Sequence, residues 1–250
     1  AFGGREKLNH KIFADLMKYT FDINPSSFCI EVGKGYFMTI YERQDVKSVI
    51  EYLMTLSPNY KKSPNRKETV KEYLSQPQPT LSFLSSEPID FLNEAVRLAM
   101  NCEGSIGVYF NIMGAVYGTL NFACAHPRLA KEWNEIFFKV FGTKGRLSKR
   151  TERWSGIQGL RIWDLEALEK FDKIGGFIGP VKITKKSKHY SGLRKNSILK
   201  AILWANKKNL RLPRDIKQVQ KHMIMHKVVE KIETEDAKSI NKISWSEVLR

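Results

Sequence analysis

The sequence contains no long hydrophobic run, only three cysteines, and many fewer acidic than basic side chains. No apolar stretch reaches the about 20 residues that a helix needs to span a bilayer, and the first residues carry no secretory signal pattern, so we expect no membrane partner. Cys29, Cys102 and Cys124 are odd in number and show no paired spacing. This usage is typical of buried, reduced thiols rather than of a disulfide framework, and it predicts a cytoplasmic protein.

Side chains that could hold a metal ion are also sparse. His222 and His226 are four residues apart on a predicted helix, but no cysteine or acidic residue completes the four ligands that zinc usually takes. The sequence therefore gives little support to a zinc site on this helix.

Positive charge, by contrast, is abundant and unevenly distributed. The chain has 42 Lys and Arg against 26 Asp and Glu, a formal net charge of +16. Residues 1–139 hold 16 basic and 15 acidic side chains, whereas residues 140–250 hold 26 and 11, so the second part carries +15 of the excess. A field of this sign favours nucleic acid or an anionic membrane surface. Because the basic residues form no amphipathic membrane helix, nucleic acid is the better interpretation, with a generic solubility charge as the alternative.

Hydrophobic periodicity divides the chain into helices and hairpins, which predicts an α+β fold. Apolar residues recur at helical spacing in the segments 10–20, 45–54, 68–74, 87–103, 126–140, 164–174, 196–207 and 213–232. Strand-like segments form hairpins that pair 28–32 with 36–41, 106–113 with 117–123, and 146–154 with 159–163. The helices after Leu193 are interpreted either as a DNA-binding pair or as a brace for the elements before them.

The helix at 87–103 is the most distinctive element. Its predicted start has Ser86 as a cap and Pro88 in the first turn. It ends with an acid, Glu103, where the helix dipole disfavours negative charge, and Gly104 begins a strand at once. Two interpretations remain open: Glu103 is a solvated surface acid, or it is placed to hold a cation. One face of the helix carries small side chains that would let a second backbone approach closely, namely Ala95, Ala99 and Cys102.

Residues 97–105, Arg-Leu-Ala-Met-Asn-Cys-Glu-Gly-Ser, resemble a degenerate LAGLIDADG motif, the helix that names a family of homing endonucleases. In that family two such helices pack side by side at a twofold or pseudo-twofold axis, and the acid before the last glycine of each binds a divalent metal ion over the DNA minor groove. The resemblance places that acid at Glu103 and the glycine at Gly104. The sequence departs from the usual motif at Leu98, where the family has a small residue, and at Asn101, where it has an acid.

An internal repeat predicts a two-part organisation. The helix after His10 resembles the helix after His126, an offset of 116 positions, and the strand ending at Tyr41 resembles the one ending at Trp163, an offset of 122. A chance likeness of short patterns is the alternative. The order of elements is similar to the αββαββα repeat of LAGLIDADG proteins, with antiparallel, saddle-shaped sheets. The expected divisions are an incomplete, N-terminally truncated first repeat at 1–75, a linker at 76–84, a complete second repeat at 85–205, and a helical C-terminal extension at 206–250.

The resemblance implies metal-dependent cutting of double-stranded DNA. Divalent metal ions activate water and stabilise the leaving oxygen, and Mg²⁺ needs only one or two protein carboxylates. Glu103 would be the catalytic acid and, with the Gly104 carbonyl, would form half of a magnesium site. The second acid would come from a homodimer paired through residues 87–103, or from a missing N-terminal segment that carries another motif.

DNA contacts are expected from outward side chains of the hairpins and from the basic loop that follows them. Arginine can fork onto guanine edges, and lysine can contact phosphates without reading sequence. The candidates are Lys34, Arg146, Lys149, Arg150, Arg153, Arg161, Lys182, Lys185, Lys186 and Lys188. The hairpin at 106–123 contains no Lys or Arg, which favours the alternative of a non-catalytic DNA-binding regulator or an RNA maturase. A structural module that contacts an acidic protein is a third interpretation.

Overall fold

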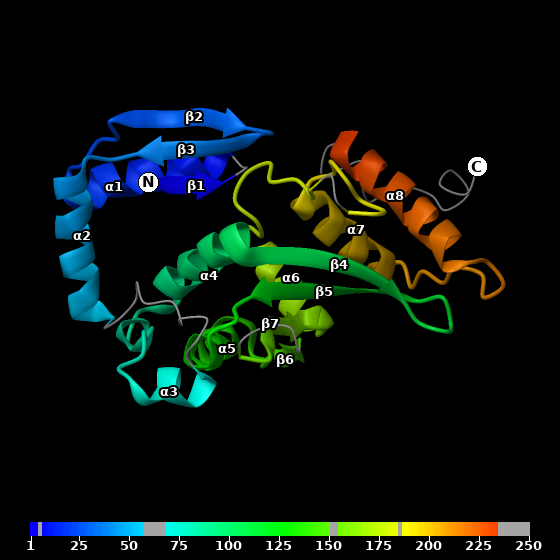
Figure 1. Cartoon of the computed structure of the whole chain (residues 1–250). Helices are drawn as coiled ribbons and strands as arrows, with labels where there is room; N and C mark the ends of the chain where they lie inside the picture. The colour runs from blue at the N-terminus through cyan, green and yellow to red at the C-terminus, as the bar shows by residue number, and fades with distance from the viewer. Residues whose placement is uncertain (5–6, 58–68, 151–154, 185–186, 235–250) are drawn as a thin grey trace. The chain divides into compact units, whose positions relative to one another are not determined.

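The structure is a computed structural model that describes residues 1–4, 7–57, 69–150, 155–184 and 187–234. The chain divides into two compact units, residues 1–86 and 87–250, here called unit 1 and unit 2. Both units contain helices and strands, and every strand pair in the described ranges is antiparallel (Figure 1). The predicted α+β class is therefore confirmed. No helix in the described ranges is long and apolar enough to cross a membrane.

Unit 1 is a three-stranded sheet with helices. Its elements are β1 (Phe2–Gly4), α1 (Lys7–Phe21), β2 (Ser27–Gly33), β3 (Tyr36–Ile40), α2 (Arg43–Leu56), α3 (Val70–Ser75) and the single-turn helix η1 (Ser82–Leu84). The strand order is β1-β3-β2. Met17 of α1, Tyr41, which follows β3, and Val49 of α2 form a small buried core.

Unit 2 has a four-stranded sheet and a much larger core. Its elements are α4 (Ile89–Glu103), β4 (Gly104–Phe110), β5 (Val116–Ala123), α5 (Pro127–Phe141), β6 (Arg146–Lys149), β7 (Ile157–Ile162), α6 (Leu165–Lys173), α7 (Lys195–Lys207) and α8 (Gln218–Thr234). The strand order is β4-β5-β7-β6. Up to α6 the order reads αββαββα.

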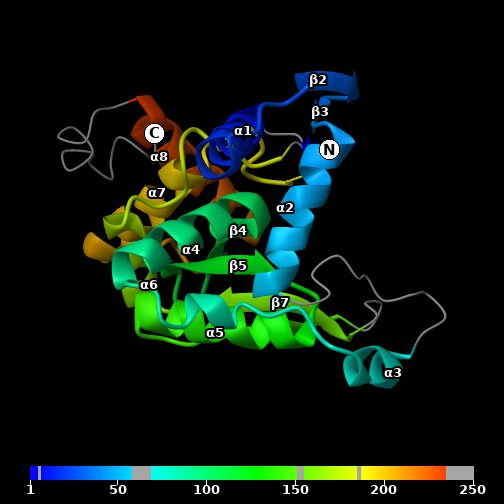
Figure 2. The ribbon, with the colours of Figure 1, turned by 90° about the vertical axis from the view of Figure 1, so that its left-hand side faces the viewer.

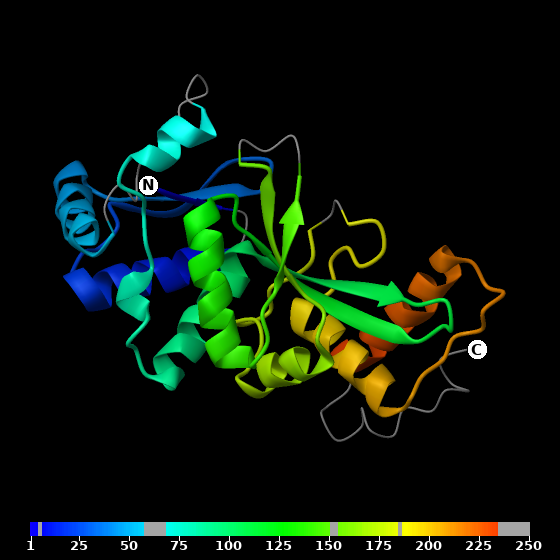
Figure 3. The ribbon, with the colours of Figure 1, turned by 90° about the horizontal axis from the view of Figure 1, so that it is seen from below.

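Helices cover one face of this sheet. A side chain added at Gly118 of β5 would lie 2.7 Å from both Ile202 of α7 and Leu168 of α6, so these helices pack directly on the strand backbone. Figure 2 shows α5 beside β7, and Figure 3 shows the long β4–β5 hairpin running beside α7 and α8. We call the face of the sheet that these helices cover the inward face. Along β4 the residues alternate between buried positions, such as Ile106 and Val108, and partly exposed ones on the outward face.

The two units share the element order β-α-β-β-α. They also share the same strand neighbours: β3 lies between β1 and β2 in unit 1, and β7 lies between β5 and β6 in unit 2. The predicted offset of 116 for the first helix is wrong, however. The two helices bury His10 and Met17 in α1 and Ala130 and Phe137 in α5, so the equivalent positions are 120 apart. His126 is the N-cap of α5 and has no equivalence to His10.

The C-terminal region and the predicted linker also differ from expectation. Residues 76–84 belong to unit 1, where Gln78 donates to the Tyr73 carbonyl and the Thr80 amide donates to Ser57. Hydrogen bonding of these buried polar groups makes the segment part of the unit's packing. Helix α8 starts at Gln218 rather than at 213 and packs on α7 through its buried side chains. The described part of residues 206–250 therefore braces unit 2 rather than extending from it.

The cap of α4 also differs from expectation. Pro88, not Ser86, occupies the N-cap position, and it makes no side-chain cap hydrogen bond. The cysteines are free, as predicted, but Cys102 is exposed and the other two are only partly buried.

Candidate functional site

Four polar side chains form a row across the outward face of the unit 2 sheet. In strand register, Ser105 of β4 lies opposite Asn121 of β5, Asn121 lies opposite Arg161 of β7, and Arg161 lies opposite Arg146 of β6. Residues directly opposite each other in an antiparallel pair project from the same face. The row, here called the polar row, thus brings two of the predicted basic residues together at the same level of the sheet.

The two arginines of the polar row repel each other. Like charges directly opposite across a strand pair destabilise it. Arg161 is partly buried, and none of the residues that the structure describes forms an ion pair or hydrogen bond with its guanidinium. A bound anion between Arg146 and Arg161 would relieve this repulsion, and a phosphate accepts two guanidinium hydrogen bonds at once. The pair is therefore suited to hold phosphate.

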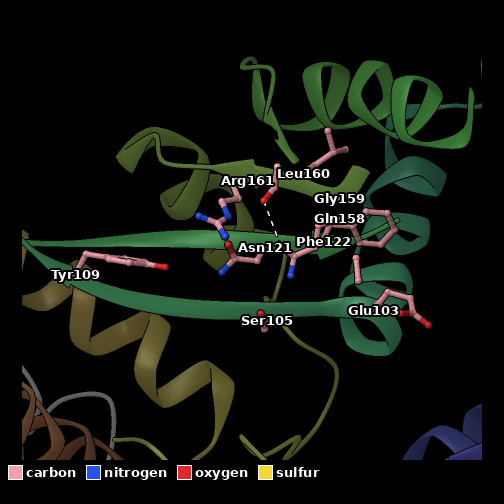
Figure 4. A pocket seen from close by; sticks show the side chains of 11 residues that line it. Glu103, Ser105, Tyr109, Asn121, Phe122, Gln158, Gly159, Leu160 and Arg161 are labelled. Atoms are coloured by element: carbon pink, nitrogen blue, oxygen red, sulfur yellow. Dashed lines mark hydrogen bonds between the residues drawn. The ribbon is translucent and has the colours of Figure 1, made fainter. Parts of the chain in front are cut away.

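A pocket of about 240 Å³ lies along the polar row (Figure 4). Glu103 stands at one end of it and Tyr109 at the other. Its polar lining residues include Ser105, Asn121, Gln158 and Arg161. The pocket combines one carboxylate, one guanidinium and neutral hydrogen-bonding groups, which is the chemistry expected around a phosphodiester.

Glu103 is the last residue of α4, and β4 begins at the next position. It is exposed at the pocket mouth. Partial desolvation of its carboxyl raises its pKa, while the positive charge of Lys195 acts in the opposite direction. Desolvation is the main cause that raises the pKa values of the Cys102 and Cys124 thiols, and the negative charge of Glu103 raises both further.

Lys195 is the residue of this site that the sequence did not reveal. Its ammonium donates a 2.7 Å hydrogen bond to the Gly104 carbonyl and lies 5.0 Å from the centre of the Phe177 ring. The side chain is only 8% exposed, at the first turn of α7. The carbonyl predicted to bind a metal ion is therefore engaged by a cation that belongs to the protein, and this ammonium opposes a second cation at the same oxygen.

The donor set for a metal ion is small. No group of three or more His, Cys, Asp or Glu side chains in the described part of the chain is arranged to hold a metal. Glu103 offers one carboxylate, and Mg²⁺ takes one or two from a protein when substrate phosphates and water supply the rest. The site thus fits a metal only as a ligand shared with substrate, and the contribution of Gly104 is weakened by Lys195.

The other predicted basic residues are dispersed. Lys149 is exposed at the end of β6, and Arg150 follows it with its amide bonded to the Gly156 carbonyl. Lys182 and Lys188 are exposed in the segment between α6 and α7. Lys34 lies in the β2–β3 turn of unit 1 with a φ of +51°. Three predicted residues lie outside the described ranges, namely Arg153, Lys185 and Lys186.

A histidine cluster lies elsewhere in unit 2. The rings of His189 and His222 stack at 4.1 Å, and the Tyr190 hydroxyl lies 3.0 Å from Nδ1 of His222. Burial, together with the nearby His189, lowers the pKa of His222 to about 4. His226 Nδ1 lies 3.3 Å from a carboxylate oxygen of Glu230. The prediction that no acidic residue lies near the two histidines of this helix did not consider Glu230. These groups pack on one another, and within the described ranges they belong to no set of three metal-binding side chains.

No protein-family model, no curated protein and no solved structure matches this chain.

Proposed function

We propose that the chain is a LAGLIDADG-like nucleic-acid-binding protein that cuts double-stranded DNA in a metal-dependent reaction. The observation that carries the proposal is the αββαββα order of unit 2 with an acid at the junction of its first helix and first strand. The shorter β-α-β-β-α order of unit 1, with equivalent strand neighbours, supports a pair of related repeats.

The proposed roles follow from the pocket and from the polar row beside it. Arg161 and Arg146 bind and orient a phosphate, and Glu103 supplies the carboxylate that shares a divalent ion with it. A bound Mg²⁺ would polarise the phosphate and lower the pKa of an attacking water. Lys195 holds the Gly104 carbonyl in place and adds positive charge behind Glu103. This arrangement supplies one carboxylate, so the second is expected from a partner motif helix, as in a homodimer paired through α4.

Cleavage of a supercoiled plasmid library with randomised inserts tests the proposal. With Mg²⁺ we expect linear products that sequencing assigns to a defined site, and with EDTA none. The Glu103→Gln variant removes the negative charge at constant size and should lower the cleavage rate by at least about 100-fold.

The matched control is Asp90→Asn, which removes an exposed carboxylate from the first turn of the same helix. It should leave cleavage unchanged. Cutting by Glu103→Gln at the rate of the unchanged protein would show that Glu103 is not the metal ligand.

A second candidate is a non-catalytic relative that binds DNA as a regulator or RNA as a maturase. The hydrogen bond from Lys195 to the Gly104 carbonyl favours it, because a buried ammonium already occupies the oxygen on which a metal would rely. Binding that falls steeply with salt, with no cleavage in Mg²⁺ or Mn²⁺, would favour this candidate.

A further inference from the structure

Three aromatic side chains form a cluster on the outward face of the unit 2 sheet, next to the polar row. Tyr109 of β4 and Tyr117 of β5 are cross-strand partners, with ring centres 5.7 Å apart and planes 19° from parallel. Trp163 follows β7, and its ring lies 5.1 Å from Tyr109 and 6.1 Å from Tyr117. The two tyrosine rings are stacked with an offset, and the Trp163 ring is tilted by 52° and 43° to them, so part of each ring stays uncovered. We call these residues the aromatic cluster.

The hydrophobic core of unit 2 does not include this cluster. Trp163 is 38% exposed and both tyrosines are partly exposed, whereas the neighbours of Tyr109 in sequence, Val108 and Phe110, are buried on the inward face. A Cβ atom at Gly107 would lie 2.8 Å from the ring of Tyr109 and 3.0 Å from the hydroxyl of Thr119. The Tyr109 ring therefore folds back along its strand over Gly107, in the direction of the pocket (Figure 4).

Two guanidinium groups lie near the cluster. The hairpin at 106–123 contains no Lys or Arg, so the cluster itself is neutral. Arg161 is two residues from Trp163 along β7, about 7 Å at strand spacing, and Arg146 lies directly opposite Arg161. The outward face therefore places a neutral aromatic surface beside two mutually repelling guanidinium groups that favour an anion.

We propose that the aromatic cluster stacks unpaired nucleobases while the arginines of the polar row contact the adjoining phosphates, so that the protein binds single-stranded nucleic acid. Aromatic stacking beside a positive track is the combination that binds single strands, because every unpaired base has an open π-face. In a duplex the bases are stacked on each other, and only their edges and the phosphates are accessible. A neutral aromatic surface gains little from a duplex.

This inference goes beyond the proposed cleavage of duplex DNA and does not depend on it. Stacking requires neither Glu103 nor a metal ion, so binding can be measured in EDTA. A protein that cut duplex DNA but ignored single strands would fail this inference and keep the proposed function, and the reverse outcome is equally distinguishable.

The experiment measures the binding of labelled 15-nucleotide oligo(U) RNA, oligo(dT) DNA and a 15-bp duplex to the whole chain in EDTA at low salt. We expect one or both single strands to bind more tightly than the duplex, and the two single-stranded arms show whether RNA or DNA is preferred. Tyr109→Ala and Tyr117→Ala should each weaken single-strand binding about 5- to 100-fold, with an unchanged salt slope and unchanged duplex binding.

Three further variants separate stacking from charge and from folding. Tyr109→Phe keeps the ring and should bind as the unchanged protein does. Tyr19→Ala removes a tyrosine that is 93% exposed on α1 and should have no effect. Arg161→Gln should weaken binding both to the single strands and to the duplex. It should also reduce the slope of log affinity against log salt concentration by about the value of one phosphate contact. Tighter binding of the duplex than of either single strand, or unchanged single-strand binding by Tyr109→Ala and Tyr117→Ala, overturns the inference.

Discussion

Units 1 and 2 place equivalent elements around sheets of different size, and their cores differ accordingly. Phe2 of β1 and Phe122 of β5 are 120 positions apart, and each packs a ring on the next helix, Phe2 on Phe13 and Phe122 on Trp133. Both contacts thus join equivalent positions. In chain order, unit 2 adds α4 and β4 before the shared elements and α7 and α8 after them. Among the described residues, the largest fully buried side chains belong to unit 2.

The difference shows in which apolar groups stay exposed. Unit 1 leaves Phe28, Ile30 and Val32 of β2 exposed along one strand, whereas the strand in the equivalent place, β6, exposes only one large apolar side chain, Leu147. A shared topology therefore does not guarantee a shared core. Since the extra helices supply the buried area of unit 2, we expect its residues to contribute more to stability than their unit 1 equivalents.

The largest expected effect contrasts two equivalent helix positions, Phe171 of α6 and Val49 of α2. Phe171 is fully buried between the rings of Phe141 and Phe177, so Phe171→Ala should lower the free energy of unfolding by about 3–5 kcal/mol. Val49→Ala removes less buried surface and should cost about 1–2 kcal/mol.

Urea unfolding can resolve the two variants, because all five tryptophans lie in residues 87–250 and their fluorescence reports unit 2. Circular dichroism reports helices of both units. Equal losses of stability for the two variants would mean that the cores of the two units are equivalent after all.

An intermediate effect concerns His10, whose equivalent in unit 2 is Ala130. His10 Nδ1 lies 2.8 Å from the hydroxyl of Thr39, and both side chains are fully buried. His10→Ala should cost about 1–3 kcal/mol, because it leaves a cavity and removes one partner of a buried hydroxyl.

Adding Thr39→Leu to His10→Ala gives unit 1 the apolar pair that unit 2 has at Ala130 and Leu160. The double variant should recover part of the lost free energy, because it also removes the buried hydroxyl that His10→Ala leaves without its histidine partner. The recovery is only partial, because the Cys29 amide then loses the Thr39 hydroxyl that accepts its hydrogen bond. Urea unfolding of both single variants and the double variant measures this coupling. Simple additivity of the two losses would contradict an energetic link between His10 and Thr39.

The smallest expected effect is at the N-caps of α6 and α2. The Asp164 side chain accepts a 2.9 Å hydrogen bond from the Glu166 amide, whereas Glu42 at the equivalent cap of α2 makes no such bond. Asp164→Ala should lower the free energy of unfolding by about 1 kcal/mol, and Glu42→Ala by close to zero. Thermal unfolding of the two variants measures the difference, and a larger loss for Glu42→Ala would refute it.

Much of the element order could be predicted from the sequence, because amphipathic helices and alternating strands leave a local pattern. The helix ending at Glu103 lies where the pattern placed it, whereas the strand predicted at 106–113 is shifted and spans Gly104–Phe110. The equivalence of the two units was misjudged by four positions because His10 and His126 share a residue type. The structure instead aligns the buried faces of the helices, which a match of single residues does not reveal.

The candidate site was only partly predictable, since it depends on strand register and on distant residues. Arg146 and Arg161 were identified as basic candidates, but their position opposite each other follows from the register between β6 and β7, which the sequence does not reveal. Lys195 lies 91 positions from Gly104, and no local pattern joins them. In the sequence, Tyr109 stands between two apolar residues, Val108 and Phe110, in an alternating strand pattern. This alternation was the signal from which the aromatic cluster could have been predicted.

The burial of Lys195 has a consequence for the chemical reactivity of the protein. Acylating reagents attack lysine amines that reach solvent in their neutral form, and Lys195 is both enclosed and held by the Gly104 carbonyl and the Phe177 ring. Exhaustive acetylation would therefore neutralise exposed lysines such as Lys149 and Lys182 while sparing Lys195. The junction of α4 and β4 would keep its positive charge in a protein whose lysine surface had become neutral.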